Sequence, residues 1–246
     1  MERFRIRNRL CRPRDRRGRS AVEYEIPLRV LAMNRLPDGR YSLSETVLFS
    51  LFAAATVAGS YHLLDLPLAA LCRSLNQQVI SFFEFVTILG EATWPLTAAA
   101  LLGLLAHFLW KRKEWVRWSL FVFTAVAASG LVTDLIKWVA GRWRPKAHVT
   151  DQFYGFDFFG VGYEQTSFPS GHATTIWAFS LALAVLFPRS RFLWYAVAIL
   201  VTMSRFVIGA HYLSDTLAGF YVAVITVILL SRLPYFQLPA RPGKPD

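Results

Sequence analysis

The chain has 246 residues, of which 54% are hydrophobic, 15% aromatic and only 17% charged, and its mean hydropathy is +0.37. This composition is too apolar for an ordinary soluble domain of this length and predicts a polytopic membrane protein. The two cysteines, Cys11 and Cys72, are too few for a disulfide framework or a zinc cluster, and the sequence carries no sign of a cofactor.

The formal net charge of +11 is concentrated at the N-terminus, where residues 1–40 hold twelve arginines and five acidic residues. Nucleic-acid binding is disfavoured, because the arginines are not interleaved with aromatic residues and a membrane segment follows at once. We interpret residues 1–40 as a basic cytoplasmic segment that faces anionic lipid. No apolar run of the kind found in a cleavable signal peptide lies in the first twenty residues, so we expect insertion to begin at an internal span.

Six apolar runs follow that can cross a bilayer or nearly do so, although the fourth and fifth are shorter than about 20 residues. We therefore expect an all-α, polytopic membrane helix bundle with six transmembrane helices, formed by residues 41–233 and followed by a Pro-rich tail, 234–246. The runs are Leu43–Leu64, Trp94–Trp110, Val116–Val139, Ala173–Phe187, Phe192–Ile208 and Leu213–Leu230.

Basic residues in the short loops predict the orientation, since loops rich in Lys and Arg stay in the cytoplasm. This rule puts both termini in the cytoplasm and loops 65–93, 140–172 and 209–212 on the outer face. Loop 140–172 breaks the rule, because it carries Arg142, Arg144 and Lys146. Anion binding is one reason for a basic cluster on that side.

Two stretches between the runs suit the membrane interface. Residues 66–93 mix charged and apolar side chains, as an amphipathic interfacial helix does. The loop between Thr150 and Phe168 holds six aromatic side chains among glycines, which fits either a plain aromatic belt or a role in gripping lipid.

Three cationic side chains lie at or near the ends of predicted spans: Lys137 and Arg205 within them and Arg144 in the loop after Lys137. Taken singly, each could snorkel or serve an ion pair, as Lys137 could with Asp134 one helical turn before it. Taken together, they match what a phosphoryl group in its transition state needs, which is fixed cationic donors around three equatorial oxygens.

The segment SFPSGHATT, residues 167–175, adds uncharged donors at the start of a predicted span. Gly171 permits close approach of the backbone, and the start of a helix offers unpaired N–H groups with partial positive charge. Ser170 adds a hydroxyl donor. We expect this segment to form one wall of a phosphate site.

Two histidines could do the chemistry. His211 precedes Asp215 by four residues, so on one helical turn the carboxylate could hold one ring N–H and leave the other nitrogen free to attack phosphorus. His172, in the other cluster, is then the candidate acid that protonates the leaving oxygen. His62, His107 and His148 lack such neighbours and are interpreted as interfacial or surface residues.

These pieces carry a family resemblance. The sequence K-x6-R-P from Lys137, the sequence PSGH from Pro169 and the sequence S-R-x5-H-x3-D from Ser204 resemble the three-part signature of the type 2 phosphatidic acid phosphatase superfamily. PSGH alone is weak evidence, but three pieces in order with membrane spans between them are a strong signal. Vanadium haloperoxidases share this anion site, but they are soluble.

The resemblance implies a metal-independent phosphatase that works through a phosphohistidine on His211, oriented by Asp215, with His172 as the acid. It implies phosphate binding by the positions matching Lys137, Arg144, Ser170, Gly171 and Arg205. The expected substrate is a phosphomonoester or diphosphate on a membrane lipid, and the candidates are undecaprenyl diphosphate, phosphatidylglycerophosphate, phosphatidic acid and a lipid A phosphate.

We further expect a bacterial inner membrane location, with the active site on the periplasmic face. The alternative function is a protein that binds or transports an anion or a lipid phosphate in the same pocket without hydrolysis. The pair of His211 and Asp215, with His172, argues against that alternative, because binding alone does not need them. A pure membrane scaffold would have no use for intramembrane Arg and His.

Overall fold

The computed structural model describes residues 43–160 and 162–236. All of them belong to one of the two units into which the chain divides, Pro27–Gln237, and this unit is considered by itself. The basic segment 1–40 lies outside the described residues, as does the tail from residue 237, so the expected domain boundaries stay predictions.

Within the described residues, regular structure is helical apart from an isolated antiparallel bridge between Arg142 and Phe156. Each of the six apolar runs forms a helix, and the ends differ from the prediction by a few residues. These helices are α1 (Leu43–Leu63), α4 (Thr93–Phe108), α5 (Lys113–Ala140), α7 (Gly171–Leu186), α8 (Arg191–Val207) and α9 (Leu213–Ser231).

The three remaining α-helices are short. Helices α2 (Asp65–Arg73) and α3 (Gln77–Thr87) occupy the stretch expected to be interfacial, and α6 (Pro145–Asp151) lies in the loop after α5. Most side chains of α2 and α3 are exposed. Helix α1 continues into α2 through a bend of 55° at Leu64.

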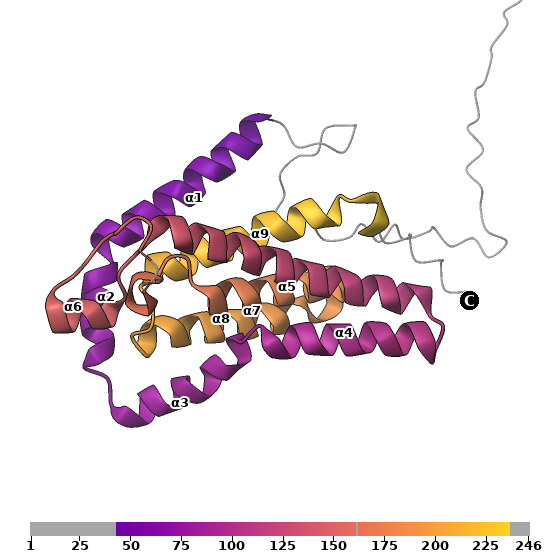
Figure 1. Ribbon diagram of the computed structural model, residues 1–246, viewed down its shortest axis with the longest axis horizontal. Coiled ribbons are helices and arrows are strands. Elements are labelled where there is room, and N and C mark those ends of the chain that lie inside the picture. Colours follow the sequence, from indigo (N-terminus) through magenta and orange to yellow (C-terminus); the bar gives the residue numbers. More distant parts are fainter. Residues whose placement is uncertain (1–42, 161, 237–246) are drawn as a thin grey trace, which may run out of the picture. The chain divides into compact units, whose positions relative to one another are not determined.

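Helix α7 lies at the centre of the bundle. It packs against α5, α8 and α9, and in Figure 1 α4, α5, α7 and α8 run side by side. Its apolar residues are spread around the helix and nine of its sixteen residues are buried, as expected of a helix enclosed by others. Trp177 and Phe179 extend from α7 into two apolar clusters with α8 and α9.

Four helical segments are long and apolar enough to cross a membrane: Gln77–Phe108, Lys113–Ala140, Pro188–Val207 and Leu213–Ser231. The bent pair α1–α2 makes a fifth if it counts as one span, and α7 is shorter than a full crossing. Less than half of the apolar window in each of the four long segments is buried, and the exposed side chains of the bundle include many large apolar ones, such as Leu48, Phe52 and Leu135. The chain is an integral membrane protein with an all-helical bundle.

Candidate active site

Three segments that are distant in sequence meet at one end of α5, α7 and α9. The residues after α5 pair with the segment before α7, where Ser167 N donates to Arg142 O at 2.9 Å. The same segment is tied to α9, since Ser170 N donates to Asp215 O at 3.0 Å. These backbone bonds bring the three parts of the sequence signature together.

Gly141 makes the sharp turn at the end of α5. Its φ of +58° is in the left-handed region, and a Cβ at this position would lie 1.7 Å from Asp157 O. Only glycine fits such a turn without a steric clash. The turn directs the next residues, Arg142 to Arg144, back across the ends of α7 and α9.

His211 lies in the turn between α8 and α9, and its side chain is buried. Gly209, with φ +67°, allows this turn, and His211 N donates to Arg205 O at 3.1 Å. The ring Nδ1 lies 2.8 Å from Ser167 O. A carbonyl oxygen only accepts, so Nδ1 carries the proton. Within the described part of the chain, the ring's hydrogen bonds all use Nδ1, and the lone pair of Nε2 is open.

Burial is the largest influence on the charge state of His211 and lowers its pKa to about 3. The Asp215 carboxylate acts in the opposite direction, whereas the cations Arg144 and Arg205 lower the pKa further. The ring is therefore neutral at physiological pH. A neutral ring with a free Nε2 is the form that can act as a nucleophile.

Asp215 is connected to His211 indirectly, through Ser167. Its Oδ2 lies 3.7 Å from His211 Nδ1, which is beyond hydrogen-bond distance. The same oxygen accepts from Ser167 Oγ at 2.6 Å and from Tyr212 N at 2.8 Å. The two residues do not share a helical turn, because α9 begins only at Leu213, and Ser167 joins the carboxylate to the ring instead.

The environment of Arg142 differs most from what the sequence predicted. We expected a loop cation available to an anion, but the side chain is fully buried and donates to two carboxylates, Asp65 and Asp215. Burial alone would lower the pKa of Arg142, but Asp215 and Asp65 outweigh it and raise the pKa above its ordinary value. Arg142 is thus a permanently charged partner of two carboxylates and not an open anion site.

Arg144 lies two residues further on and is also buried, but it pairs with no carboxylate among the described residues. Its guanidinium donates to three backbone carbonyls: Tyr163 O at 2.9 Å, Ala210 O at 3.1 Å and Thr166 O at 3.4 Å. It also lies over the Tyr163 ring, 4.1 Å from the centroid. The guanidinium carries five N–H donors, so two remain for another acceptor.

Lys137 and Arg205 complete the set of cations. A Cβ on Gly171 would lie 3.3 Å from Lys137 Nζ, so the ammonium group is next to the start of α7. Arg205 donates to Thr87 Oγ1 from α3, and within the described residues its buried Nε has no hydrogen-bond partner. Buried donors without partners are rare, and an anion would satisfy this one.

The first turn of α7 forms the remaining wall. Ser170 Oγ is fully buried and, among the described residues, lacks a partner. Ser170 N–H is not available to a ligand, because Asp215 O accepts it. The N–H groups expected to face an anion are therefore those of Gly171 and His172, which a helix leaves unpaired in its first turn.

His172 lies within reach of all three cations, because the charges of Arg205, Lys137 and Arg144 act on its ring. Gly90 packs closely against this ring, since a Cβ there would lie 2.9 Å from His172 Cδ2. This contact fixes the side of α7 on which the ring lies. The described residues contain no group of three or more His, Cys, Asp or Glu side chains that could hold a metal ion.

The structure brings the sequence-predicted residues into one region and adds others that the motifs do not contain. The predicted residues that meet here are Lys137, Arg144, Ser170, Gly171, His172, Arg205, His211 and Asp215. The residues that sequence reasoning missed are Asp65, Thr87, Gly90, Ser167 and the role of Arg142. The sequence does contain one indication of Asp65, because an acidic residue directly after an apolar run needs a partner.

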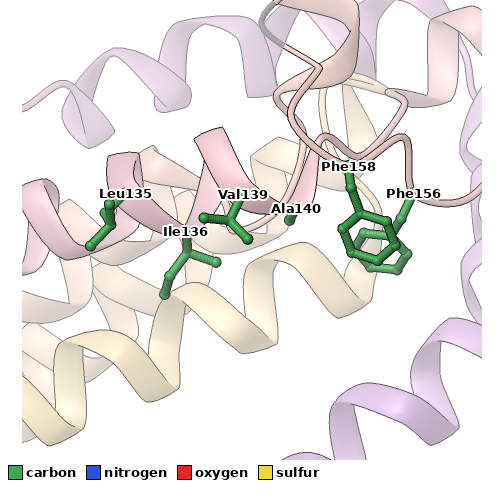
Figure 2. Close-up of a pocket in the computed structure, with 6 residues that line it drawn as sticks. All are labelled: Leu135, Ile136, Val139, Ala140, Phe156 and Phe158. Atoms are coloured by element: carbon green, nitrogen blue, oxygen red, sulfur yellow. The ribbon is translucent and has the colours of Figure 1, made fainter.

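An apolar groove of about 430 Å³ lies next to this region. Figure 2 shows Leu135, Ile136 and Val139 on the last turns of α5, with Phe156 and Phe158 from the following loop beside them. The two phenylalanine rings are stacked, with 6.2 Å between centroids. The groove thus begins on the same helical turns as Lys137.

Known proteins resemble this chain in sequence and in fold. A lipid A 1-phosphatase of Rhizobium etli is 35% identical over 190 residues, which are 72% of this chain and 81% of that protein. A lipid A 4'-phosphatase of Porphyromonas gingivalis is 29% identical over 148 residues, 57% of this chain and 61% of that protein.

Two solved structures share the fold. The first is a transmembrane PAP2 type phosphatidylglycerolphosphate phosphatase from Bacillus subtilis, with a TM-score of 0.55, 21% identity and coverage of 77% of this chain and 93% of that one. The second is Aquifex aeolicus LpxE, with a TM-score of 0.51, 21% identity and coverage of 68% and 94%. The PAP2 superfamily matches residues 118–238, which include all three parts of the signature, and the chain belongs to this superfamily.

Proposed function

We propose that this membrane phosphatase removes phosphate from a membrane lipid and that a lipid A 1-phosphate is its substrate. The observation that carries the proposal is a neutral, buried His211 whose Nδ1 proton is held by Ser167 O and whose Nε2 is free, with the cations Arg144 and Arg205 acting on the ring. The relative named as a lipid A 1-phosphatase, 35% identical over most of its length, favours lipid A over phosphatidic acid, phosphatidylglycerophosphate and undecaprenyl diphosphate.

In the first step, Lys137, Arg144 and Arg205 hold the three non-bridging oxygens of the phosphate. Ser170 Oγ and the N–H groups of Gly171 and His172 donate to the same oxygens. The three cations also offset the negative charge that spreads over these oxygens in the transition state.

In the second step, His211 Nε2 attacks phosphorus. An N–P bond forms as the P–O bond to the lipid breaks, and His172 gives its proton to the leaving oxygen. A water molecule then attacks phosphorus, the N–P bond breaks, and His172 takes the proton of that water. Inorganic phosphate leaves, and both histidines return to their starting states.

The apolar groove beside Lys137 supports a lipid substrate. Each side chain that lines it is apolar, and Leu135, Ile136 and Val139 come from the same turns of α5 as Lys137. An acyl chain in this groove would let a headgroup phosphate reach Lys137 without leaving the membrane. The anion-transport alternative gains no specific support, since transport needs no oriented nucleophile.

The assay that tests the function is release of inorganic phosphate in detergent from lipid A 1-phosphate, phosphatidic acid, phosphatidylglycerophosphate and undecaprenyl diphosphate, with p-nitrophenyl phosphate as a water-soluble control. We expect the highest kcat/KM on lipid A 1-phosphate. His211→Ala should abolish turnover on every substrate, a loss of about 10⁴-fold or more, because the nucleophile is gone. Near wild-type turnover in this variant would exclude the proposed mechanism.

We also propose six membrane crossings, with α7 as the short fourth one, both termini in the cytoplasm and the site on the periplasmic face of an inner membrane. Support comes from the distribution of basic loops and from the apolar helices. Gly160 lies in the loop on the side of the site, so the Gly160→Cys variant should react with a membrane-impermeant maleimide added to intact spheroplasts. Labelling only after lysis would reverse the proposed orientation.

A further inference from the structure

Two buried residues, Arg142 and Asp65, take no part in the proposed steps but form an ion cluster with Asp215. Arg142 Nη2 donates to Asp65 Oδ2 at 2.6 Å, and Arg142 Nη1 donates both to Ser214 Oγ at 2.6 Å and to Asp215 Oδ1. All three charged side chains are shielded from solvent. A buried ion cluster of this kind is costly to form, so it calls for a function beyond stability.

Asp65 reaches the cluster because of the bend in the first span. It is the first residue of α2, directly after the 55° break between α1 and α2. Its Oδ1 accepts from Ser214 N at 2.9 Å and its Oδ2 from Ser214 Oγ. Asp65 therefore holds the first turn of α9, in which Asp215 is the next residue after Ser214.

A continuous path of contacts leads from this cluster to the nucleophile. Arg142 and Tyr212 N fix the two oxygens of Asp215, and Ser167 Oγ donates to Oδ2 at 2.6 Å. Ser167 O then accepts the Nδ1 proton of His211 at 2.8 Å. The orientation of the imidazole thus depends on Arg142 through Asp215 and Ser167, and on Asp65 through its bond to Arg142.

The cluster also has a charge that matters for the reaction. Two carboxylates and one guanidinium leave a net charge of one negative unit, in a region where aromatic rings replace water. The rings of Tyr61 and Tyr212 lie 4.8 and 4.6 Å from the Arg142 guanidinium carbon. When Nε2 of His211 bonds to phosphorus while Nδ1 keeps its proton, the ring becomes positive. A net negative cluster nearby favours that charge.

Without Asp65, the cluster would be neutral, because Arg142 would cancel Asp215 alone. Asp65 thus compensates Arg142 and leaves the charge of Asp215 available to the ring. We propose that Asp65 and Arg142 are positioning residues for the phosphatase reaction, which fix Asp215 and keep one net negative charge beside His211 as the N–P bond forms. This inference rests on the proposed role of His211 as the nucleophile.

The variant that tests it is Asp65→Asn, which keeps the shape and one acceptor oxygen but removes the charge. It removes the excess buried charge, so the protein should fold and insert. We expect kcat on the preferred lipid to fall about 10- to 100-fold, as for the outer partners that orient metal-bound histidines. The inhibition constant of inorganic phosphate should change by less than about two-fold, because Asp65 does not touch the cations that bind phosphate.

A second variant, a control variant and a single-turnover measurement complete the test of Asp65→Asn. Arg142→Lys keeps a cation but has a single nitrogen in place of the two that bond Asp65 and Asp215 separately. It should show the same fall in kcat with unchanged phosphate inhibition, and it carries the test if Asp65→Asn does not fold. Glu84→Gln, which changes an exposed carboxylate of α3, is the matched control and should behave as wild type. The rate of phosphoenzyme formation in a single turnover should fall in parallel with kcat.

Wild-type kcat in Asp65→Asn would overturn the inference. So would equal losses of kcat, phosphate binding and melting temperature, since that pattern indicates a merely structural role. His211→Ala separates the two proposals. If this variant retains turnover, the proposed function fails; if it is inactive while Asp65→Asn is fully active, only the role of Asp65 and Arg142 fails.

Discussion

Arg142 and Arg144 are separated by one residue, yet they lie in opposite electrostatic regions. Arg142 is enclosed by two carboxylates and aromatic rings, whereas Arg144, as far as the structure describes the chain, donates to three backbone carbonyls and keeps two N–H groups for a ligand. Arg142 forms an isolated β-bridge with Phe156, whereas Arg144 is the N-cap residue of α6, so the two side chains leave the backbone from different local structures. One short segment thereby supplies both the ion cluster and the phosphate-facing side.

A positive charge alone therefore does not identify an anion-binding site. Both arginines are nearly buried, so burial does not separate them either. What separates them is whether an acidic partner has already neutralised the cation. His211 lies between the two regions: its Nδ1 side is joined to Asp215 through Ser167, and Arg144 and Arg205 act on it from the phosphate side.

The largest expected effect comes from removing each arginine in turn. Arg142→Met leaves Asp65 and Asp215 buried without a cation, and we expect a loss of about 3–5 kcal/mol in stability. Arg144→Met removes hydrogen bonds from three carbonyls, and we expect a smaller loss of about 1–3 kcal/mol. Thermal unfolding of both variants in the same detergent, followed by intrinsic fluorescence, measures the difference.

Phosphate binding should reverse that order. In Arg144→Met the inhibition constant of inorganic phosphate should rise, because a cation of the site is lost, while any Arg142→Met protein that remains folded should bind phosphate nearly as wild type does. If the two variants lose stability equally and bind phosphate equally, the two arginines do not belong to distinct regions and the comparison is invalid.

The motif spacing predicted Arg144 but not Arg142, and the reason is physical. A signature of the form K-x6-R-P identifies residues whose ligand is the same in each member of a family. Arg142 depends on Asp65, which comes from a different helix 77 positions earlier and reaches the site only through a bend in the first span. Neither the bend nor the pairing leaves a periodic pattern in the sequence.

The helices were easier to predict than the site contacts. Long apolar runs leave little choice but a helix in a membrane, so six helices were predicted with nearly correct ends. By contrast, i,i+4 spacing suggested that Asp215 bonds directly to His211. That spacing assumes a helix, but His211 lies in the turn before α9, and Ser167 occupies the position between the two side chains.

A smaller expected effect is the pH dependence of folding stability, which tests whether His211 stays unprotonated in the folded protein. Burial lowers its pKa to about 3 from an ordinary value of 6.5. In the unfolded chain the ring gains a proton below pH 6.5, but in the folded protein it does not until about pH 3. Folding stability from this group is therefore fully present above pH 6.5 and is lost as pH falls toward 3.

We expect the free energy of unfolding to fall between pH 6.5 and 5 by up to about 1.4 kcal/mol per pH unit from His211 alone. The His211→Gln variant cannot gain this proton, so its melting temperature in detergent should be less sensitive to acid over the same interval. An equal acid sensitivity in both proteins would mean that His211 is already protonated in the folded state. A protonated ring has no free Nε2, so the same result would exclude His211 as the resting nucleophile.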